Sequence, residues 1–226
     1  MQLLLSLSPV PALPLAGLAH GSLLILWGVV LAWLGLAVVV RILPLLVWRF
    51  RIAVACAIVA CCFLPALANM PTLSPAYWLG LAFQSPSLAL TAIALLRLWA
   101  HASAGSRGIA VPKQARSAAL SVLCMLGVAL GWVLLLDTLA FWPRSVYALG
   151  FGAGALWCVA LGLLVFAWRW QGVAMWALCA VLLAFAVSRL PSGNLWDALL
   201  DPLLWFGLHL KLLRDVWAAY KAKKSR

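Results

Sequence analysis

The stretch NLWDALLDPLLWFGLHLK, residues 194–211, decides how often this chain is expected to cross a membrane. It is strongly apolar, yet it carries Asp197 and Asp201, two of the four acidic residues in the sequence. A helix from Asp197 to Lys211 would be about 21 Å long, which is shorter than a hydrocarbon core of about 30 Å. We interpret the stretch as a short span. Without this crossing, the basic residues from Lys211 onward would lie on the opposite side of the membrane from nearly all other Lys and Arg residues.

The composition of the whole chain predicts that lipid is its solvent. Of its 226 residues, 67% are hydrophobic and 9% are charged, and the mean hydropathy is +1.13. Soluble domains are about 45–50% apolar and about 25% charged. We therefore predict an all-α fold, a polytopic bundle of transmembrane helices that forms a single domain over residues 1–226, with no soluble domain.

Apolar runs separated by proline, glycine and basic residues predict seven spans. They are expected near residues 21–40, 52–69, 78–99, 117–141, 146–168, 172–188 and 195–213. Residues 1–20 are apolar but rich in proline, which breaks helices, so an irregular interfacial segment is expected there. We expect the third span to continue through Pro86 and the seventh to kink at Pro202, and residues 214–226 to form a basic tail on the inner membrane face.

The distribution of positive charge predicts the orientation of the bundle. When the spans alternate between the two sides, all Lys and Arg residues except Arg144 and Arg189 fall on one side. Short loops rich in Lys and Arg stay in the cytoplasm, so the N-terminus is expected outside and the C-terminus inside. The residues expected to contact anionic lipid headgroups are Arg49, Arg51, Lys211, Arg214, Lys221, Lys223, Lys224 and Arg226. The Leu-, Ala- and Trp-rich composition favours a bacterial inner membrane.

Asp137, Arg144, Arg189, Asp197 and Asp201 are predicted to form one polar cluster on the outer side. An ionised Asp in lipid is costly unless it is paired or hydrated, so ion pairs between these carboxylates and the two arginines are expected. Two interpretations remain open. The pairs either staple short turns to helix ends, or they line an outward-facing pocket for a substrate headgroup, for protons or for a partner.

Small and thiol-bearing residues indicate packing rather than cofactor binding. The motifs Gly127/Gly131 and Gly150/Gly154 allow close approach of helices, and one hypothesis is that they meet each other. The cysteines lie in apolar runs without the spacing of zinc or haem sites, so neither a metal nor a cofactor is expected. They are Cys56, Cys61, Cys62, Cys124, Cys158 and Cys179.

Three functional hypotheses follow. The sequence contains no Glu, no H-E-x-x-H, no G-x-S-x-G and no phosphate-binding loop, so no catalytic residue is assigned. The leading hypothesis is a non-catalytic accessory or scaffolding subunit of a bacterial envelope system. The alternatives are a small transporter or lipid-handling protein that uses the polar cluster, and an integral membrane enzyme that acts on a lipid-linked substrate. Expected partners are membrane lipids and a membrane protein, and nucleic acid is not expected.

Overall fold

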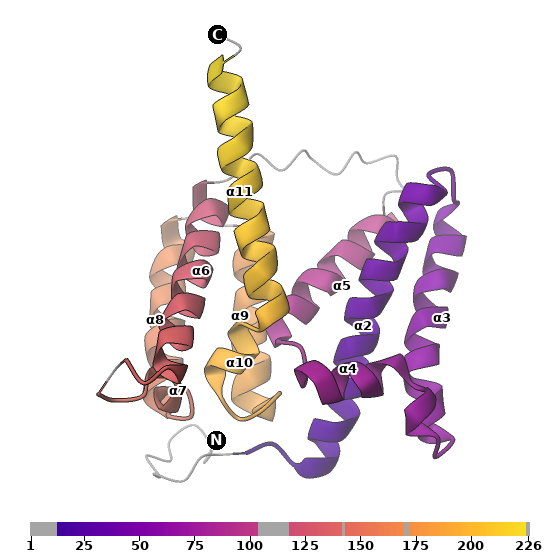
Figure 1. The fold of residues 1–226 in the computed structure, drawn as a ribbon, viewed down its shortest axis with the longest axis horizontal. Helices are drawn as coiled ribbons and strands as arrows, with labels where there is room; N and C mark the ends of the chain where they lie inside the picture. Colours follow the sequence, from indigo (N-terminus) through magenta and orange to yellow (C-terminus); the bar gives the residue numbers. More distant parts are fainter. Residues whose placement is uncertain (1–12, 104–117, 142, 170–171, 225–226) are drawn as a thin grey trace.

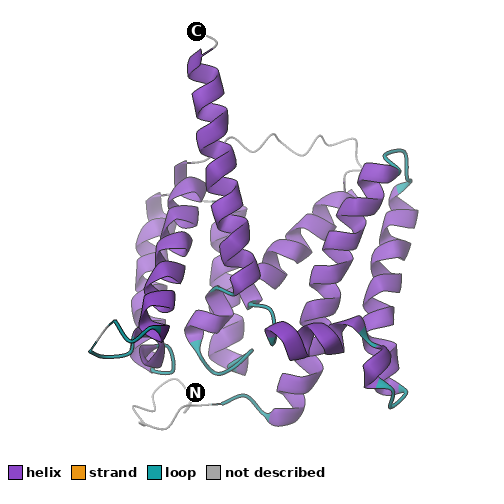
Figure 2. Cartoon of the chain, viewed as in Figure 1, coloured by secondary structure: helices purple, strands orange, loops and turns teal. Residues whose placement is uncertain are grey.

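The structure is a computed structural model that describes residues 13–103, 118–141, 143–169 and 172–224. This part of the chain consists of helices joined by loops and contains no strand (Figure 2). The predicted all-helical fold is therefore confirmed for the described residues. The expectations for residues 1–12 and for Arg226 lie outside them.

The helices follow one another in a simple order along the chain (Figure 1). They are α2 (Ala16–Ile42), α3 (Trp48–Leu67), the short 3-10 helix η1 (Pro71–Leu73), α4 (Pro75–Phe83), α5 (Leu88–Ser103), α6 (Ala118–Thr138), α7 (Val146–Leu149), α8 (Ala153–Arg169), α9 (Val173–Ser188), α10 (Leu195–Leu199) and α11 (Pro202–Lys224).

Three of these helices are long and apolar enough to cross a membrane. They are α2, α3 and the segment Leu120–Thr138 of α6, and the helices Leu88–His101, Ala153–Trp168 and Val173–Ser188 are apolar but shorter. Large apolar side chains also face outward. Trp168 is 89% exposed, for example. Because so much apolar surface faces away from the protein, these features agree with membrane association.

The helices form two groups that meet at α5 (Figure 1). In the first group α2 packs against α3, α4 and α5, and in the second α6 packs against α11 and α8 against α9. Contacts of α5 with α9 and α10 join the groups. The core therefore runs continuously from Trp27 in α2, through Ala94 in α5, to Phe185 in α9 and Leu195 in α10, all of which are buried.

The expected third span is broken in the structure. Helix α4 ends before Gln84, which has a φ of +61°, and α5 begins only at Leu88. Proline lacks the backbone N–H and disfavours a helical residue before it, so Pro86 ends the helix here instead of kinking it. The indole Nε1 of Trp27 donates a 2.7 Å hydrogen bond to the Gln84 carbonyl and so satisfies part of the interrupted backbone.

Other boundaries also require correction. The fifth expected span divides into α7 and α8 at residues 150–152, and the seventh divides into α10 and α11. The first begins earlier than expected, because residues from Ala16 onward are helical rather than irregular. The basic tail is helical as far as Lys224, because α11 continues through it and extends away from the bundle (Figure 1).

The glycine motifs pack against other partners than each other. A Cβ atom at Gly127 would lie 2.6 Å from Cδ1 of Leu208 in α11, and one at Gly131 would collide with the Trp205 indole. Gly150 lies against Asn194, while a Cβ at Gly154 would meet no described atom within 4 Å. The two glycines in α6 therefore allow α11 to pack closely against α6, and the hypothesis that the two motifs meet is wrong.

Candidate functional site

Two residues of the predicted cluster, Asp137 and Asp197, lie at the end of the bundle where the α6–α7 and α9–α10 loops come together. Asp137, in the last turn of α6, accepts hydrogen bonds from the backbone N–H groups of Val146 (3.0 Å) and Tyr147 (2.8 Å). It also accepts one from the Ser145 hydroxyl at 2.8 Å. The first N–H groups of a helix have no partner within it, so this carboxylate fixes the start of α7 to the end of α6.

Tyr147 connects Asp137 to Asp197. Its hydroxyl donates a 2.7 Å hydrogen bond to Oδ2 of Asp197, and the Ser192 hydroxyl donates to the same oxygen. Two of the three predicted outer carboxylates are therefore joined through one residue, Tyr147, whose backbone N–H donates to Asp137 and whose hydroxyl donates to Asp197.

Asn194 is the fully buried centre of this end of the bundle, with 0% exposure. Its Oδ1 accepts from the N–H of Trp196 at 2.9 Å, which caps α10, and its Nδ2 donates to the Tyr147 carbonyl at 2.9 Å. The Trp196 indole donates to the Val146 carbonyl at 3.0 Å. Helices α7 and α10 are therefore held together by hydrogen bonds that use both side chain and backbone.

Asp201 lies at the junction of the two broken segments. Its Oδ1 accepts from the N–H of Leu204 at 2.8 Å, so Asp201 is the N-cap of α11 with Pro202 at the first helical position. Its Oδ2 accepts from the N–H of Ser87 at 2.8 Å, and Ser87 in turn caps α5 through the N–H of Leu90 at 3.0 Å. The expected kink at Pro202 is corrected to a true helix start, and one carboxylate joins the N-termini of two helices.

The arginines do not pair with these carboxylates as predicted. Among the described residues, no ion pair joins Asp137, Asp197 or Asp201 to Arg144 or Arg189, and the ion pair that is present there joins Lys211 to Asp215 in α11 at 2.7 Å. Other donors take the place of the guanidinium groups. N–H groups at helix starts donate to Asp137 and Asp201, and the hydroxyls of Tyr147 and Ser192 donate to Asp197.

Arg189 and Arg144 occupy very different surroundings. Arg189 ends α9 in the left-handed conformation (φ +57°), is only 5% exposed, and has its guanidinium 5.3 Å from the centre of the Phe185 ring. Arg144 is exposed in the α6–α7 loop. Both therefore belong to loops that border the cluster, but the structure shows no direct contact of Arg144 with its carboxylates among the described residues.

The described basic residues expected at lipid headgroups lie in the first turn of α3 and along the middle and C-terminal part of α11. Arg49 and Arg51 are in the first turn of α3, where Arg49 lies 5.6 Å from the centre of the Trp48 ring. Lys221 similarly covers the Trp217 ring at 5.4 Å. The remaining described members of this set are all on α11: Lys211, Arg214, Lys223 and Lys224.

Several residues of the cluster were missed from the sequence. Tyr147, Ser192 and Asn194 were given no role. Ser87 was expected only to help satisfy a carbonyl freed by Pro86, although Asn and Ser in front of an apolar run are typical helix N-caps. That capping signal was present at Asn194 and Ser87, and it could have located the breaks before α10 and α5. The Tyr147 hydroxyl had no comparable local signal, because its partner is distant in sequence.

The arrangement can stabilise helix ends but offers few groups for chemistry. Within the described residues no three His, Cys, Asp or Glu side chains come together in a way that could hold a metal ion. Comparison with protein-family models, with curated proteins and with solved structures finds no match to this chain. A functional conclusion therefore depends on the geometry.

Proposed function

We propose that this chain is a polytopic membrane protein that crosses a bacterial inner membrane seven times, with its N-terminus outside and its C-terminus in the cytoplasm. The crossings would be α2, α3, α4 with α5, α6, α7 with α8, α9, and α10 with α11. The apolar outer surface and the collection of nearly all Lys and Arg residues on one side support this arrangement.

We propose further that the protein is a non-catalytic accessory or scaffolding subunit of an envelope system. The observation that carries this proposal is the use of the acidic residues. The chain has four, and each has partners inside the protein: Asp137, Asp197, Asp201 and Asp215. A general base must reach the proton that it abstracts from a substrate, and carboxylates that already accept from helix N–H groups, from hydroxyls or from a lysine are poorly placed to do so. The cluster fits the stapling interpretation better than the pocket interpretation.

A second candidate function is a small transporter or lipid-handling protein. It is favoured by the meeting of two broken segments at Asp201, where the N-termini of α5 and α11 share one carboxylate. In secondary transporters, substrate and ion sites lie where discontinuous helices meet within the membrane. Under this alternative, Asp201 and Ser87 would take part in the site.

Purification in mild detergent separates these candidates. A scaffold is expected to bring a membrane-protein partner in stoichiometric amount, and Asp197→Ala is expected to lower the abundance of the protein while leaving the partner bound to what remains. Asp215→Ala is the matched control, because it removes a carboxylate at a distance from the cluster. Recovery of the protein alone, with transport lost in Asp201→Asn at unchanged abundance, would instead favour the transporter.

The orientation is tested independently by a tag fused after Arg226. In intact cells the tag is expected to be inaccessible to reagents added from outside and to become accessible once the inner membrane is opened. A tag that reacts in intact cells would contradict the seven-span arrangement.

A further inference from the structure

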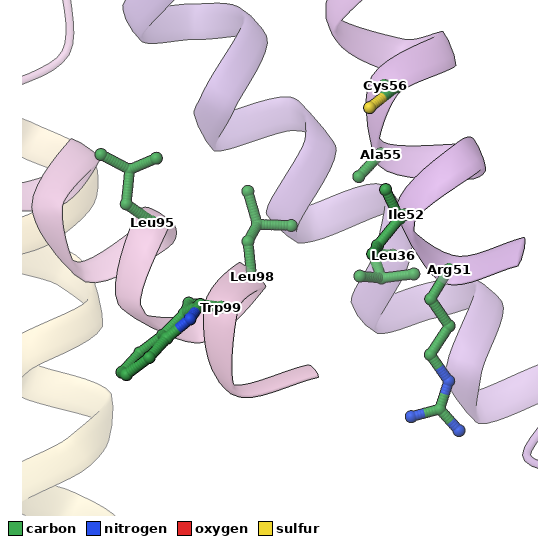
Figure 3. A pocket seen from close by; sticks show the side chains of 8 residues that line it. All are labelled: Leu36, Arg51, Ile52, Ala55, Cys56, Leu95, Leu98 and Trp99. Carbon is green, nitrogen blue, oxygen red and sulfur yellow. The ribbon is translucent and has the colours of Figure 1, made fainter. Parts of the chain in front are cut away.

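A groove runs between α2, α3 and α5 near the end of the bundle opposite the polar cluster (Figure 3). It has a volume of about 280 Å³. Leu36 of α2 lines the groove and is only 2% exposed. In Figure 3 the labelled side chains of α5 lie on one side and those of α3 on the other, and the groove is lined by Leu36, Arg51, Ile52, Ala55, Cys56, Leu95, Leu98 and Trp99. All of these are apolar or weakly polar except Arg51.

The charged end of the groove is held in place by the α2–α3 turn. Arg51 donates from Nε to the Leu46 carbonyl at 2.8 Å and from Nη2 to the Pro44 carbonyl at 3.3 Å. A guanidinium has five N–H donors, so three remain for a ligand. His101 of α5 lies within electrostatic reach of both Arg51 and Arg97, so two guanidinium groups lie near one another at this end.

We propose that this groove is a binding site for an anionic phospholipid, with one acyl chain against Ile52, Leu98 and Trp99 and the phosphate at Arg51. The inference rests on the membrane placement proposed above and adds a defined lipid site to it. The volume is just below the range of about 300–1,000 Å³ for pockets that enclose whole small molecules, so it fits part of a chain rather than a complete lipid.

The charge of the site selects the headgroup. An acyl chain gains equally from this apolar groove whatever its headgroup, so the groove alone gives no preference. A phosphate that lacks a neighbouring ammonium group gains more from Arg51 and Arg97 than a zwitterionic headgroup does. Arg51 also loses little side-chain freedom on binding, because two carbonyls already hold it.

Fluorescence quenching by brominated acyl chains tests this site directly. The full-length protein is reconstituted in phosphatidylcholine vesicles that contain a minor share of brominated phosphatidylglycerol or, in parallel, brominated phosphatidylcholine. The chain has 14 Trp residues, so the Trp99 signal is the difference between wild type and Trp99→Phe. Half-quenching of that signal is expected at about a fivefold lower share of brominated phosphatidylglycerol than of brominated phosphatidylcholine. This ratio corresponds to a difference in binding free energy of about 1 kcal/mol.

Variants separate the site from general contact with lipid. Arg51→Gln is expected to remove the headgroup preference, whereas Arg49→Gln, the same charge change two residues away, is expected to keep it. Ala55→Phe fills the groove without changing charge, so it is expected to weaken quenching by both lipids.

Three results would overturn the proposal. The first is equal half-quenching by the two lipids in wild type, and the second is an equal effect of Arg49→Gln and Arg51→Gln. The third is loss of the preference when inorganic phosphate is added at constant ionic strength, which would identify a phosphate site instead. The accessibility of the tag after Arg226 is measured separately, so failure of the lipid site is distinguishable from failure of the membrane topology.

Discussion

Replacement of Asp201 tests how the two broken segments are held together. Asp201→Ala removes the acceptors of two backbone N–H groups, those of Leu204 and Ser87. Loss of an N-cap costs about 0.5–2 kcal/mol. Ser87 is fully buried, so its N–H cannot turn to water, and a buried donor left without a partner costs about 1–3 kcal/mol. We therefore expect the free energy of unfolding to fall by about 2–4 kcal/mol.

The comparison of Asp201→Ala with two further variants identifies the source of this loss. Asp201→Asn keeps one acceptor oxygen but loses the negative charge that faces two helix N-termini. The interaction of this charge with each helix dipole is worth about 0.3–1 kcal/mol, so the loss in free energy of unfolding is expected to be intermediate. Asp215→Ala removes a partly exposed carboxylate of an i, i+4 pair, for which about 0.5 kcal/mol or less is expected.

The assay is reversible unfolding in mixed micelles, followed by circular dichroism. The expected order of destabilisation is Asp201→Ala, then Asp201→Asn, then Asp215→Ala. Equal effects of Asp201→Ala and Asp215→Ala would refute the reasoning that the carboxylate joins α5 and α11.

The same measurement checks three other substitutions. Tyr147→Phe removes the hydroxyl that donates to Asp197, and a loss of about 1 kcal/mol is expected; an unchanged midpoint would mean that this link contributes nothing. Gly131→Leu places a side chain where α11 packs, so a loss of about 1–3 kcal/mol is expected, whereas Gly207→Leu, whose Cβ meets no described atom within 4 Å, should have little effect. Gln84→Gly relieves a residue at φ +61° and ψ −155°, so a gain of about 1 kcal/mol is expected, and a loss would show that this backbone is not strained.

The sequence was sufficient to predict the helices whose boundaries depend on local signals. Helices α2, α3, α6 and α9 each coincide with most of an expected span, because long apolar runs and basic or proline-rich turns define them. The breaks within other spans were not predictable in this way. A proline inside an apolar run either kinks or ends a helix, and the outcome depends on distant donors such as the Trp27 indole, 57 residues before Gln84.

The candidate site shows the same limit. Counting charges drew attention to Asp137, Asp197 and Asp201, but it paired them with the arginines because side-chain charges are visible in a sequence. Backbone N–H groups at helix starts are equally good partners, and they become visible only once the breaks are known. Ser87, for example, whose N–H donates to Asp201, is 114 residues away in the sequence.

Helix α11 has a mechanical consequence. It runs without interruption for 23 residues, about 34 Å at ~1.5 Å per residue, from its capped base at Pro202 to Lys224. Such a rod acts as a lever arm: a tilt of about 10° at its base would swing its basic tip by about 6 Å. A rearrangement too small to disturb the packing around Ser87 would thus be amplified at the far end, where Lys221, Lys223 and Lys224 stand.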